Sequence, residues 1–162
     1  MKNKRFFIPI AILLLLCGYL AGRAQSQGTQ PAKSEPPAEQ VTGIGGIFLK
    51  AQDPKKLAAW YRDNLGIPVK GGMSVFLWSE KDKPEQTGRT IWRLFPANTT
   101  YFGASRSPVM INYRVTSLER MIEQLRRKGV AVEKTEDSEY GRFAWVTDPE
   151  GNRMELWEPK GK

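Results

Sequence analysis

The sequence predicts an α+β domain built from two βαβββ modules in one chain. The main observation is an internal repeat. In segments 46–53 and 110–117, apolar residues recur at every second position, Ile47, Leu49 and Ala51 in the first and Ile111, Tyr113 and Val115 in the second, which is the period of a half-buried strand. A helical pattern follows each segment directly, and three further strand-like segments follow each helix. An internal repeat of this kind indicates one supersecondary unit used twice.

Local signals mark where the helices begin and end. Asp53 is a suitable N-cap, and Pro54 occupies the first helical position, where its missing N–H costs nothing. Gly66 is expected to end this helix. Thr116 and Glu119 form a capping-box pattern at the start of the second helix. The apolar positions at helical spacing are Leu57, Trp60, Tyr61 and Leu65 in the first helix and Leu118, Met121, Ile122 and Leu125 in the second.

Three strands are expected after each helix. In the first module they lie near residues 67–70, 73–79 and 90–95. In the second module they lie near residues 130–134, 142–147 and 152–158. The last two are joined by a turn at 148–152, where proline presets φ and glycine and asparagine tolerate positive φ.

The first 24 residues have the pattern of a secretory signal peptide. A basic start precedes the apolar run 6–16, and small residues stand at 22 and 24, where a signal peptidase would inspect them. The apolar run is short for a membrane span, which needs about 20 residues. An uncleaved anchor through residues 6–22 is the alternative. We therefore expect an exported protein, periplasmic or extracellular, or one held at the membrane by this segment.

A change of composition separates this segment from the rest of the chain. Residues 25–40 are rich in Gln, Pro, Ser, Ala and Glu and are predicted to be a disordered linker. Residues 41–160 have the size of one ordinary domain. The repeat divides this domain into modules of about 41–103 and 104–160.

Composition excludes several classes of function. The net charge of the 162 residues is +8, but without the four basic residues of the signal the chain has 21 basic and 17 acidic residues, a net charge of +4. These charges are spread along the chain, which indicates a solvated surface and no nucleic-acid partner. The only cysteine, Cys17, lies in the signal, so the domain has no disulfide. Histidine is absent, which removes the commonest metal ligand and excludes a Ser–His hydrolase.

Two segments resemble the glyoxalase/bleomycin-resistance/dioxygenase, or vicinal oxygen chelate (VOC), superfamily. They are residues 60–66, Trp-Tyr-Arg-Asp-Asn-Leu-Gly, and residues 148–159, Asp-Pro-Glu-Gly-Asn-Arg-Met-Glu-Leu-Trp-Glu-Pro. The resemblance covers residues 41–160 and implies one glyoxalase-like domain with a mixed sheet curled around a cavity. Members include glyoxalase I, the extradiol (dihydroxybiphenyl) dioxygenases and bleomycin-binding proteins without chemistry, so the fold does not fix the function. Members are often dimers, so the resemblance also implies a homodimer as one expected state of this chain.

Enzymes of this superfamily hold a divalent metal with side chains from the first and last strands of each module. The repeat assigns these positions to Gly46, Met110, Trp92 and Glu155. Only Glu155 can bind a hard or borderline divalent ion. One carboxylate cannot replace the three or four ligands that such a site needs. We therefore expect a member that lacks the metal-binding histidines and has neither a metal nor another cofactor.

Strand alternation then predicts which side chains line the cavity. The expected set is Gly46, Phe48, Lys50, Trp92, Leu94, Met110, Asn112, Arg114, Arg153, Glu155 and Trp157. Within it, the predicted ligand-binding residues are Phe48, Trp92, Met110, Asn112, Arg114, Glu155 and Trp157. The aromatic rings would stack on a planar ligand, and Arg114 would pair with a carboxylate or phosphate.

Three functions are compatible with the sequence. The first is metal-independent binding of a small aromatic or anionic molecule in the cavity between the modules. The second is a glyoxalase-like lyase or isomerase that uses Glu155 as a catalytic general base, with its pKa raised by burial. The third is a structural or partner-binding module whose cavity is filled by Trp92 and Met110, with Glu155 and Arg114 as an internal ion pair.

Overall fold

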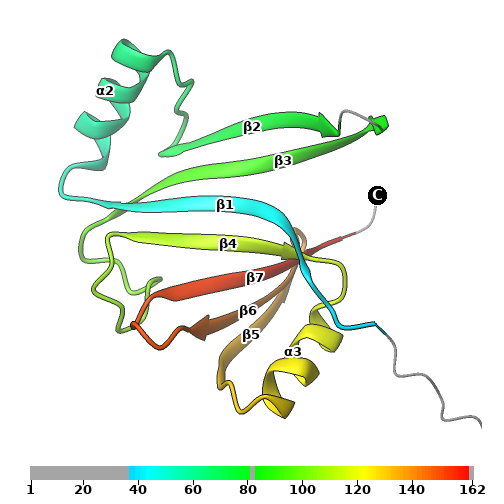
Figure 1. Cartoon of the computed structure of the whole chain (residues 1–162). Helices are drawn as coiled ribbons and strands as arrows, with labels where there is room; N and C mark the ends of the chain where they lie inside the picture. The colour runs from blue at the N-terminus through cyan, green and yellow to red at the C-terminus, as the bar shows by residue number, and fades with distance from the viewer. Residues whose placement is uncertain (1–36, 81–82, 161–162) are drawn as a thin grey trace, which may run out of the picture. The chain divides into compact units, whose positions relative to one another are not determined.

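A computed structural model describes residues 37–80 and 83–160 of the chain (Figure 1). Seven strands form one mixed sheet in the order β2-β3-β1-β4-β7-β6-β5. The elements in chain order are β1 (Val41–Ala51), α2 (Pro54–Leu65), β2 (Met73–Glu80), β3 (Lys83–Pro96), β4 (Val109–Val115), α3 (Leu118–Arg127), β5 (Val132–Ser138), β6 (Gly141–Thr147) and β7 (Arg153–Pro159). The predicted α+β fold of two modules is confirmed. The predicted signal segment 1–24 and most of the predicted linker lie outside the described residues.

The two modules meet at the centre of the sheet. The first strand of each module, β1 and β4, pair with each other in antiparallel fashion, and Ile47 stands opposite Ile111. On either side, the last strand of each module runs parallel to its first, because β3 pairs with β1 and β7 pairs with β4. The internal repeat of the sequence therefore appears as two similar halves of one sheet.

The expected strand near residues 67–70 does not form. Only an isolated bridge between Lys70 and Met73 stands at its place, so the first module has three strands and the second has four. Pro68 has no N–H to give to a sheet. Gly71 and Gly72, both at positive φ, then turn the chain directly into β2.

The helix α2 begins and ends as predicted. The side chain of Asp53 accepts a hydrogen bond from the backbone N–H of Lys56 at 3.0 Å, and Pro54 stands at the first helical position. Gly66 ends the helix in the left-handed conformation with φ of 65°. These signals are local, and for this reason they could be read from the sequence.

The start of α3 differs from the expected capping box by one residue. Ser117, not Thr116, is the N-cap, and its side chain accepts a hydrogen bond from the N–H of Arg120. The N–H groups of Thr116 and Ser117 donate to the carboxylate of Glu39, each at 3.0 Å. A residue from before β1 therefore completes this helix end.

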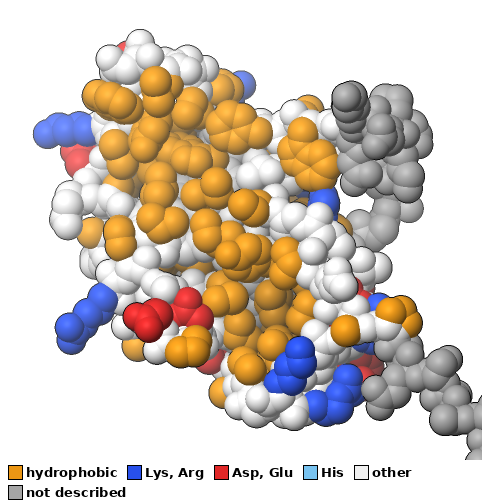
Figure 2. All heavy atoms as spheres, in the orientation of Figure 1, with side chains coloured by type: hydrophobic (Ala, Val, Ile, Leu, Met, Phe, Trp, Pro, Cys, Tyr) orange, Lys and Arg blue, Asp and Glu red, His pale blue; other side chains and the backbone are white. Residues whose placement is uncertain are grey.

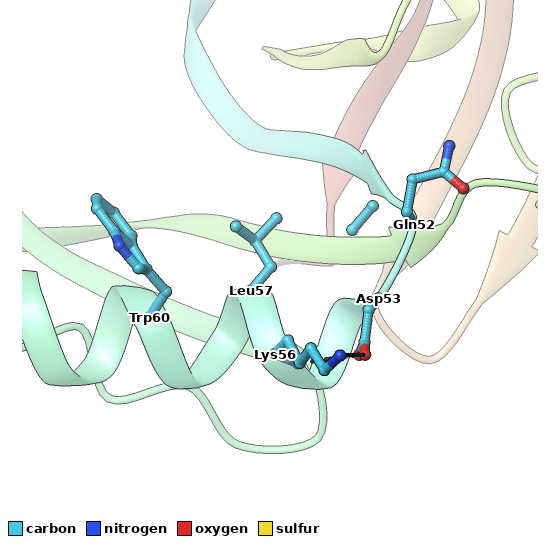
Figure 3. A pocket seen from close by; sticks show the side chains of 6 residues that line it. Gln52, Asp53, Lys56, Leu57 and Trp60 are labelled. Carbon is cyan, nitrogen blue, oxygen red and sulfur yellow. Dashed lines mark hydrogen bonds and ion pairs between the residues drawn. The ribbon is translucent and has the colours of Figure 1, made fainter.

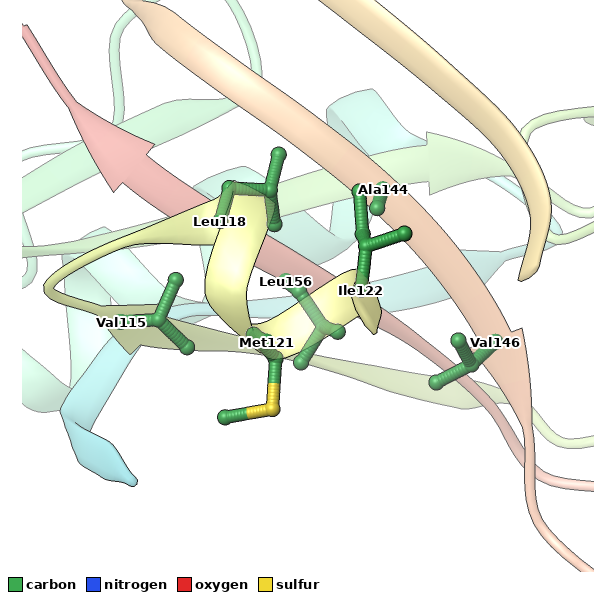
Figure 4. Packing of buried hydrophobic residues seen from close by; sticks show 7 residues of the cluster. All are labelled: Val115, Leu118, Met121, Ile122, Ala144, Val146 and Leu156. Carbon is green, nitrogen blue, oxygen red and sulfur yellow. The ribbon is translucent and has the colours of Figure 1, made fainter. Parts of the chain in front are cut away.

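Both helices lie on the same face of the sheet. From α3, Leu118, Met121 and Ile122 pack on the sheet in a buried cluster with Val115, Ala144, Val146 and Leu156 (Figure 4). Tyr61 of α2 packs on Trp92 of β3 with ring centroids 4.7 Å apart. Strand pairing places Trp92 beside Ile47, Ile47 beside Ile111, and Tyr113 beside Leu156. We call this side the helix face and the opposite side the helix-free face.

The segment just before β1 packs against the domain through Glu39. Glu39 is buried, and its backbone N–H and C=O both bond to the side-chain amide of Gln124 at 3.0 Å. The last residues of the predicted linker 25–40 therefore contact the domain. Neither α2 nor α3, the helices of the described residues, has the length and hydrophobicity of a membrane-spanning helix.

Candidate functional site

The helix-free face carries a second buried cluster, which is mostly aromatic. Alternating residues of the central strands supply part of it, and the loop between the modules, residues 97–108, supplies the rest. The buried members are Phe48, Phe95, Phe102, Met110 and Trp145, with Ile91, Tyr101 and Phe143 packed against them. The loop is fixed to the sheet, because Lys50 Nζ donates to the carbonyl of Ser105 at 2.8 Å and Arg153 Nη1 donates to the carbonyl of Tyr101 at 2.7 Å.

Glu155 of β7 lies at the centre of this cluster and is 1% exposed. The hydroxyl of Tyr101 donates to its Oε2 at 2.5 Å. The side-chain amide of Asn112, its neighbour on β4, donates to its Oε1 at 2.5 Å. Each carboxylate oxygen therefore has a hydrogen-bond donor from a different element.

The surroundings of Glu155 change its acidity. Burial raises the pKa of Glu155 above its ordinary value, and the hydrogen bonds from Tyr101 and Asn112 oppose this shift without cancelling it. Burial and the neighbouring Glu155 raise the pKa of the Tyr101 hydroxyl far above its ordinary value. Tyr101 therefore stays protonated at neutral pH and can only donate to the carboxylate.

Two polar atoms beside this carboxylate have no hydrogen-bond partner among the described residues. They are Oδ1 of Asn112, an acceptor, and Nε1 of Trp145, a donor, and both side chains are buried. Trp145 pairs with Glu155 across β6 and β7, and it lowers the pKa of the carboxyl without forming a well-directed hydrogen bond. Buried polar atoms without partners cost free energy, so each needs an explanation.

The prediction that Trp92 and Leu94 line the cavity is wrong. Trp92 pairs with Ile47 and stacks edge-to-face on Tyr61 of α2, so both Trp92 and Leu94 belong to the helix face. On β3 the helix-free face instead carries Arg89, Ile91, Arg93 and Phe95. A shift of one residue along a strand moves its side chains to the other face, and the repeat alone could not fix that register.

The pairing also corrects the positions that would hold a metal. Glu155 stands opposite Asn112, and Asn112 stands opposite Gly46, which in turn stands opposite Ile91. The residues at the expected metal position are thus Gly46, Ile91, Asn112 and Glu155, in place of the set that contained Met110 and Trp92. Only two of these offer oxygen, and both oxygens of the carboxylate are already engaged. Among residues 37–80 and 83–160, no three His, Cys, Asp or Glu side chains lie close enough to hold a metal ion. The donor set does not fit the metal of the superfamily enzymes.

Of the other predicted ligand-binding residues on the helix-free face, four lie in one cluster and Arg114 lies apart from it. Phe48, Met110, Asn112 and Glu155 lie together in the aromatic cluster, at 7%, 1%, 3% and 1% exposure. Arg114 does not pair with Glu155, so the predicted internal ion pair is wrong. Its guanidinium donates to Thr42 and lies 4.8 Å from the ring of Trp78.

Trp157 lies two residues beyond Glu155 on the same face and is also buried. Its ring stacks on Phe143 with centroids 6.4 Å apart and an angle of 12° between the planes. The guanidinium of Arg89 from the first module lies over it at 5.7 Å. The contact between Arg89 and Trp157 joins the two modules across the helix-free face.

Sequence reasoning missed Tyr101, Phe102, Phe143, Trp145 and Arg89. Phe143 and Trp145 alternate within a predicted strand, and that period could have placed them opposite Ala144 and Val146. Tyr101 and Phe102 lie in an irregular loop without any period, so no local signal predicts that they cover Glu155.

The comparisons with known proteins agree with this architecture. The family model described as a glyoxalase-like domain matches residues 46–157. A comparison with curated proteins found no match. A methylmalonyl-CoA epimerase solved in complex with methylmalonyl-CoA and NH4+ superimposes with a TM-score of 0.56 at 17% identity, over 75% of this chain and 97% of that chain.

Two further solved structures are similar. One is a Streptomyces coelicolor methylmalonyl-CoA epimerase variant in complex with 2-nitronate-propionyl-CoA, with a TM-score of 0.54 at 16% identity, over 75% of this chain and 100% of that chain. The other is a hypothetical protein from Bacillus halodurans, with a TM-score of 0.50 at 15% identity, over 74% of this chain and 96% of that chain. At these identities the similarity shows the fold alone.

Proposed function

The chain belongs to the glyoxalase-like domain family of the VOC superfamily, and we propose that it binds a small aromatic or anionic molecule on the helix-free face without a metal ion. The observation that carries this proposal is the polar group at the centre of the aromatic cluster. A buried carboxylate, Glu155, stands there between an acceptor of Asn112 and a donor of Trp145 that lack partners. A few convergent polar groups among aromatic rings are typical of a small-molecule site.

The charges of the same face favour an anionic ligand. On β3, Arg89 and Arg93 are exposed and lie over the rings of Trp157 and Phe95, at 5.7 and 4.7 Å. A flat ligand with a carboxylate or phosphate would stack beside Trp157 and pair with Arg89. The exposed apolar side chains of Met73, Val75 and Leu77 on β2 share this face and would contact its apolar part.

Export is part of the proposal and rests on the sequence. The basic start, apolar run and small residues of segment 1–24 favour a signal peptide, with an anchor through residues 6–22 as the alternative. In either case the ligand would be met outside the cytoplasm or at a membrane surface.

A second function, a lyase or isomerase with Glu155 as general base, is favoured by one observation. The raised pKa of Glu155 brings a carboxylate toward the range in which it can accept a proton at neutral pH. The hydroxyl of Tyr101 covers that carboxylate in the structure. A substrate would therefore have to displace Tyr101 before Glu155 could act on it.

The test is ligand titration of the purified full chain with a panel of aromatic carboxylates and phosphates, by calorimetry, after native mass spectrometry with metal analysis. The chain offers a matched pair of variants. Trp157 and Trp92 are both buried, at 6% and 7% exposure, but lie on opposite faces. We expect saturable binding that Trp157→Phe weakens about tenfold, or about 1.4 kcal/mol, and that Trp92→Phe leaves unchanged.

Each other outcome contradicts a part of the proposal. A stoichiometric metal ion would show that the site holds one despite its donor set. Binding that is lost equally in both variants would place the ligand elsewhere. Exchange of a ligand C–H proton with D2O, lost in Glu155→Gln, would establish the lyase or isomerase. Absence of binding to the whole panel would favour the third function, a structural or partner-binding module with a filled cavity. Of the two residues predicted to fill it, Met110 lies in the aromatic cluster with Phe102 and Trp145, whereas Trp92 lies on the other face.

A further inference from the structure

The side chain of Tyr101 fills a defined slot in the aromatic cluster. Its ring stacks on Phe95 with centroids 4.9 Å apart and an angle of 16° between the planes. The rings of Phe48 and Trp145 form T-shaped contacts with it, at 6.1 and 5.9 Å. At the end of the slot its hydroxyl donates to the carboxylate of Glu155 at 2.5 Å. The slot therefore takes one planar ring with a hydrogen-bond donor at its tip.

Tyr101 does not belong to the strands that form the slot. It lies in the loop 97–108, whereas the residues around it stand on β1, β3, β6 and β7. The backbone of Tyr101 is held in place, because its carbonyl accepts a hydrogen bond from Arg153 at 2.7 Å. Its side chain is only half-buried, although the next residue, Phe102, is 0% exposed. The ring of Tyr101 can therefore turn out toward solvent while the loop and Phe102 stay on the sheet.

The polar atoms of the slot restrict what can replace Tyr101. If its ring left without a substitute, Oε2 of Glu155 would lose its donor inside an apolar cluster, which is costly for a carboxylate. A molecule that takes the place of Tyr101 must therefore bring its own donor to this oxygen. Nε1 of Trp145 has no partner while Tyr101 is in place, so the replacement would gain further by offering this indole an acceptor.

We propose that Tyr101 is a built-in occupant of the ligand site, and that the ligand displaces it with a phenol ring whose hydroxyl donates to Glu155. The inference rests on the proposed function, since it concerns the same face, and it adds the chemical class of the ligand. A phenol supplies both the ring and the donor that Tyr101 withdraws. An acidic group of the ligand would point away from the Glu155 carboxylate, toward the exposed guanidinium groups of Arg89 and Arg93.

Displacement has a sign that separates it from a purely structural role of Tyr101. A tethered side chain competes with a free ligand at a high effective concentration. The apparent affinity for the ligand is reduced by the fraction of chains in which Tyr101 has left the slot. Tyr101→Phe keeps the ring but removes its bond to Glu155, so that fraction rises and the ligand binds more tightly. A tyrosine that contacts the bound ligand would give the opposite result.

The helix face offers a competing site for an aromatic molecule, and it provides the control. Figure 2 shows apolar side chains gathered on the surface between α2 and α3. None of the residues of α2 is buried, and Trp60 is 52% exposed. Its ring lines a hollow of about 380 Å³ together with Ala51, Gln52, Asp53, Lys56 and Leu57 (Figure 3). Trp60→Leu removes this ring and leaves the slot on the helix-free face intact.

The experiment titrates the full chain with 4-hydroxybenzoate and with 4-fluorobenzoate, in which fluorine of similar size replaces the donor. Calorimetry measures the affinities, and NMR of 13C-labelled tyrosine follows the Tyr101 ring, whose signal is identified by its loss in Tyr101→Phe. We expect 4-hydroxybenzoate to bind at least tenfold more tightly than 4-fluorobenzoate and to move the Tyr101 signal to the position of an exposed tyrosine. Tyr101→Phe should bind 4-hydroxybenzoate at least tenfold more tightly than the wild type, and Trp60→Leu should bind it equally well. Circular dichroism checks that both variants are folded.

Every other result overturns the inference. Equal affinity for the two benzoates would show that Glu155 does not select a donor. Weaker binding to Tyr101→Phe would show that Tyr101 holds the ligand and is not displaced by it. Binding that is lost in Trp60→Leu would place the ligand on the helix face.

The same titrations distinguish this inference from the proposed function. Suppose that 4-hydroxybenzoate binds neither the wild type nor Tyr101→Phe, while other aromatic anions bind in a way that depends on Trp157. The displacement of Tyr101 by a phenol would then be wrong, and the proposed function would stand. Absence of binding for every compound in both chains would overturn the two together.

Discussion

Replacement of Glu39 tests how the segment before β1 is joined to the domain. The Glu39 side chain is 2% exposed, and its carboxylate accepts hydrogen bonds from the N–H groups of Thr116 and Ser117 at 3.0 Å and from Arg120 Nε at 3.0 Å. Glu39→Gln keeps one oxygen for the backbone N–H groups but loses the ion pair with Arg120. Because the Arg120 side chain is 50% exposed, that pair contributes no more than about 1 kcal/mol. The poorer cap at the helix end adds about 0.5–1 kcal/mol.

We therefore expect Glu39→Gln to lower the free energy of unfolding by about 1–2 kcal/mol, and Glu39→Ala, which leaves two N–H groups without an acceptor, by about 3 kcal/mol. Urea denaturation followed by circular dichroism measures both. The control is Glu119→Gln, which removes an exposed acidic residue from the first turn of the same helix and should cost only about 0.5 kcal/mol. If Glu39→Gln costs no more than Glu119→Gln, the reasoning is refuted.

The pH dependence of the same variant gives an independent check. Burial alone would raise the pKa of Glu39, but the hydrogen bonds from Arg120, Ser117 and Thr116 outweigh it and hold the pKa below its ordinary value of 4.5. A carboxyl whose pKa is lowered by folding stabilises the protein fully above its unfolded pKa and loses this effect as the pH falls through the folded pKa. The difference between wild type and Glu39→Gln should be constant near neutral pH and shrink in acid. A difference that persists in strong acid would contradict this.

Three further changes have definite expected outcomes. In Gly45→Ala the new Cβ would lie 2.2 Å from Oδ1 of Asn112 and 2.6 Å from the Trp157 ring. We therefore expect the free energy of unfolding, measured by urea denaturation, to fall by about 1–3 kcal/mol and the near-UV circular dichroism spectrum to change. An unchanged spectrum would contradict the close packing. Burial raises the pKa of Glu155, so folding disfavours its charged form and the wild type loses stability as the pH rises. Glu155→Gln should therefore be at least as stable as the wild type at pH 8, and the difference in stability between the two should be smaller at pH 5. A variant that is less stable than the wild type at pH 8 would refute this. Phe102→Ala removes a ring that is 0% exposed and should cost about 3–5 kcal/mol, whereas a loss below about 1 kcal/mol would show that the loop does not fill the helix-free face.

The strand register shows where sequence patterns stop being informative. The period-two pattern of β1 and β4 correctly predicted that Phe48, Met110 and Asn112 share a face with Glu155. For β3, a shift of one residue in the assumed correspondence placed Trp92 in the cavity, whereas Ile91 occupies that position. The pattern Ile-Trp-Arg-Leu-Phe is apolar on both faces, so periodicity alone could not decide between the two registers.

The sequence by itself determined the order of elements except for the expected strand near residues 67–70, the two-module repeat, both helix starts to within one residue, the family, and the absence of histidine. These properties depend on residues close together in the chain or on composition. The tertiary structure decided what surrounds Glu155, because Tyr101, Asn112 and Trp145 come from three separate elements. It also decided that α2 stays uncovered and that Glu39 completes α3. Such contacts join residues tens of positions apart, and they depend on strand register and loop path, which no local preference fixes.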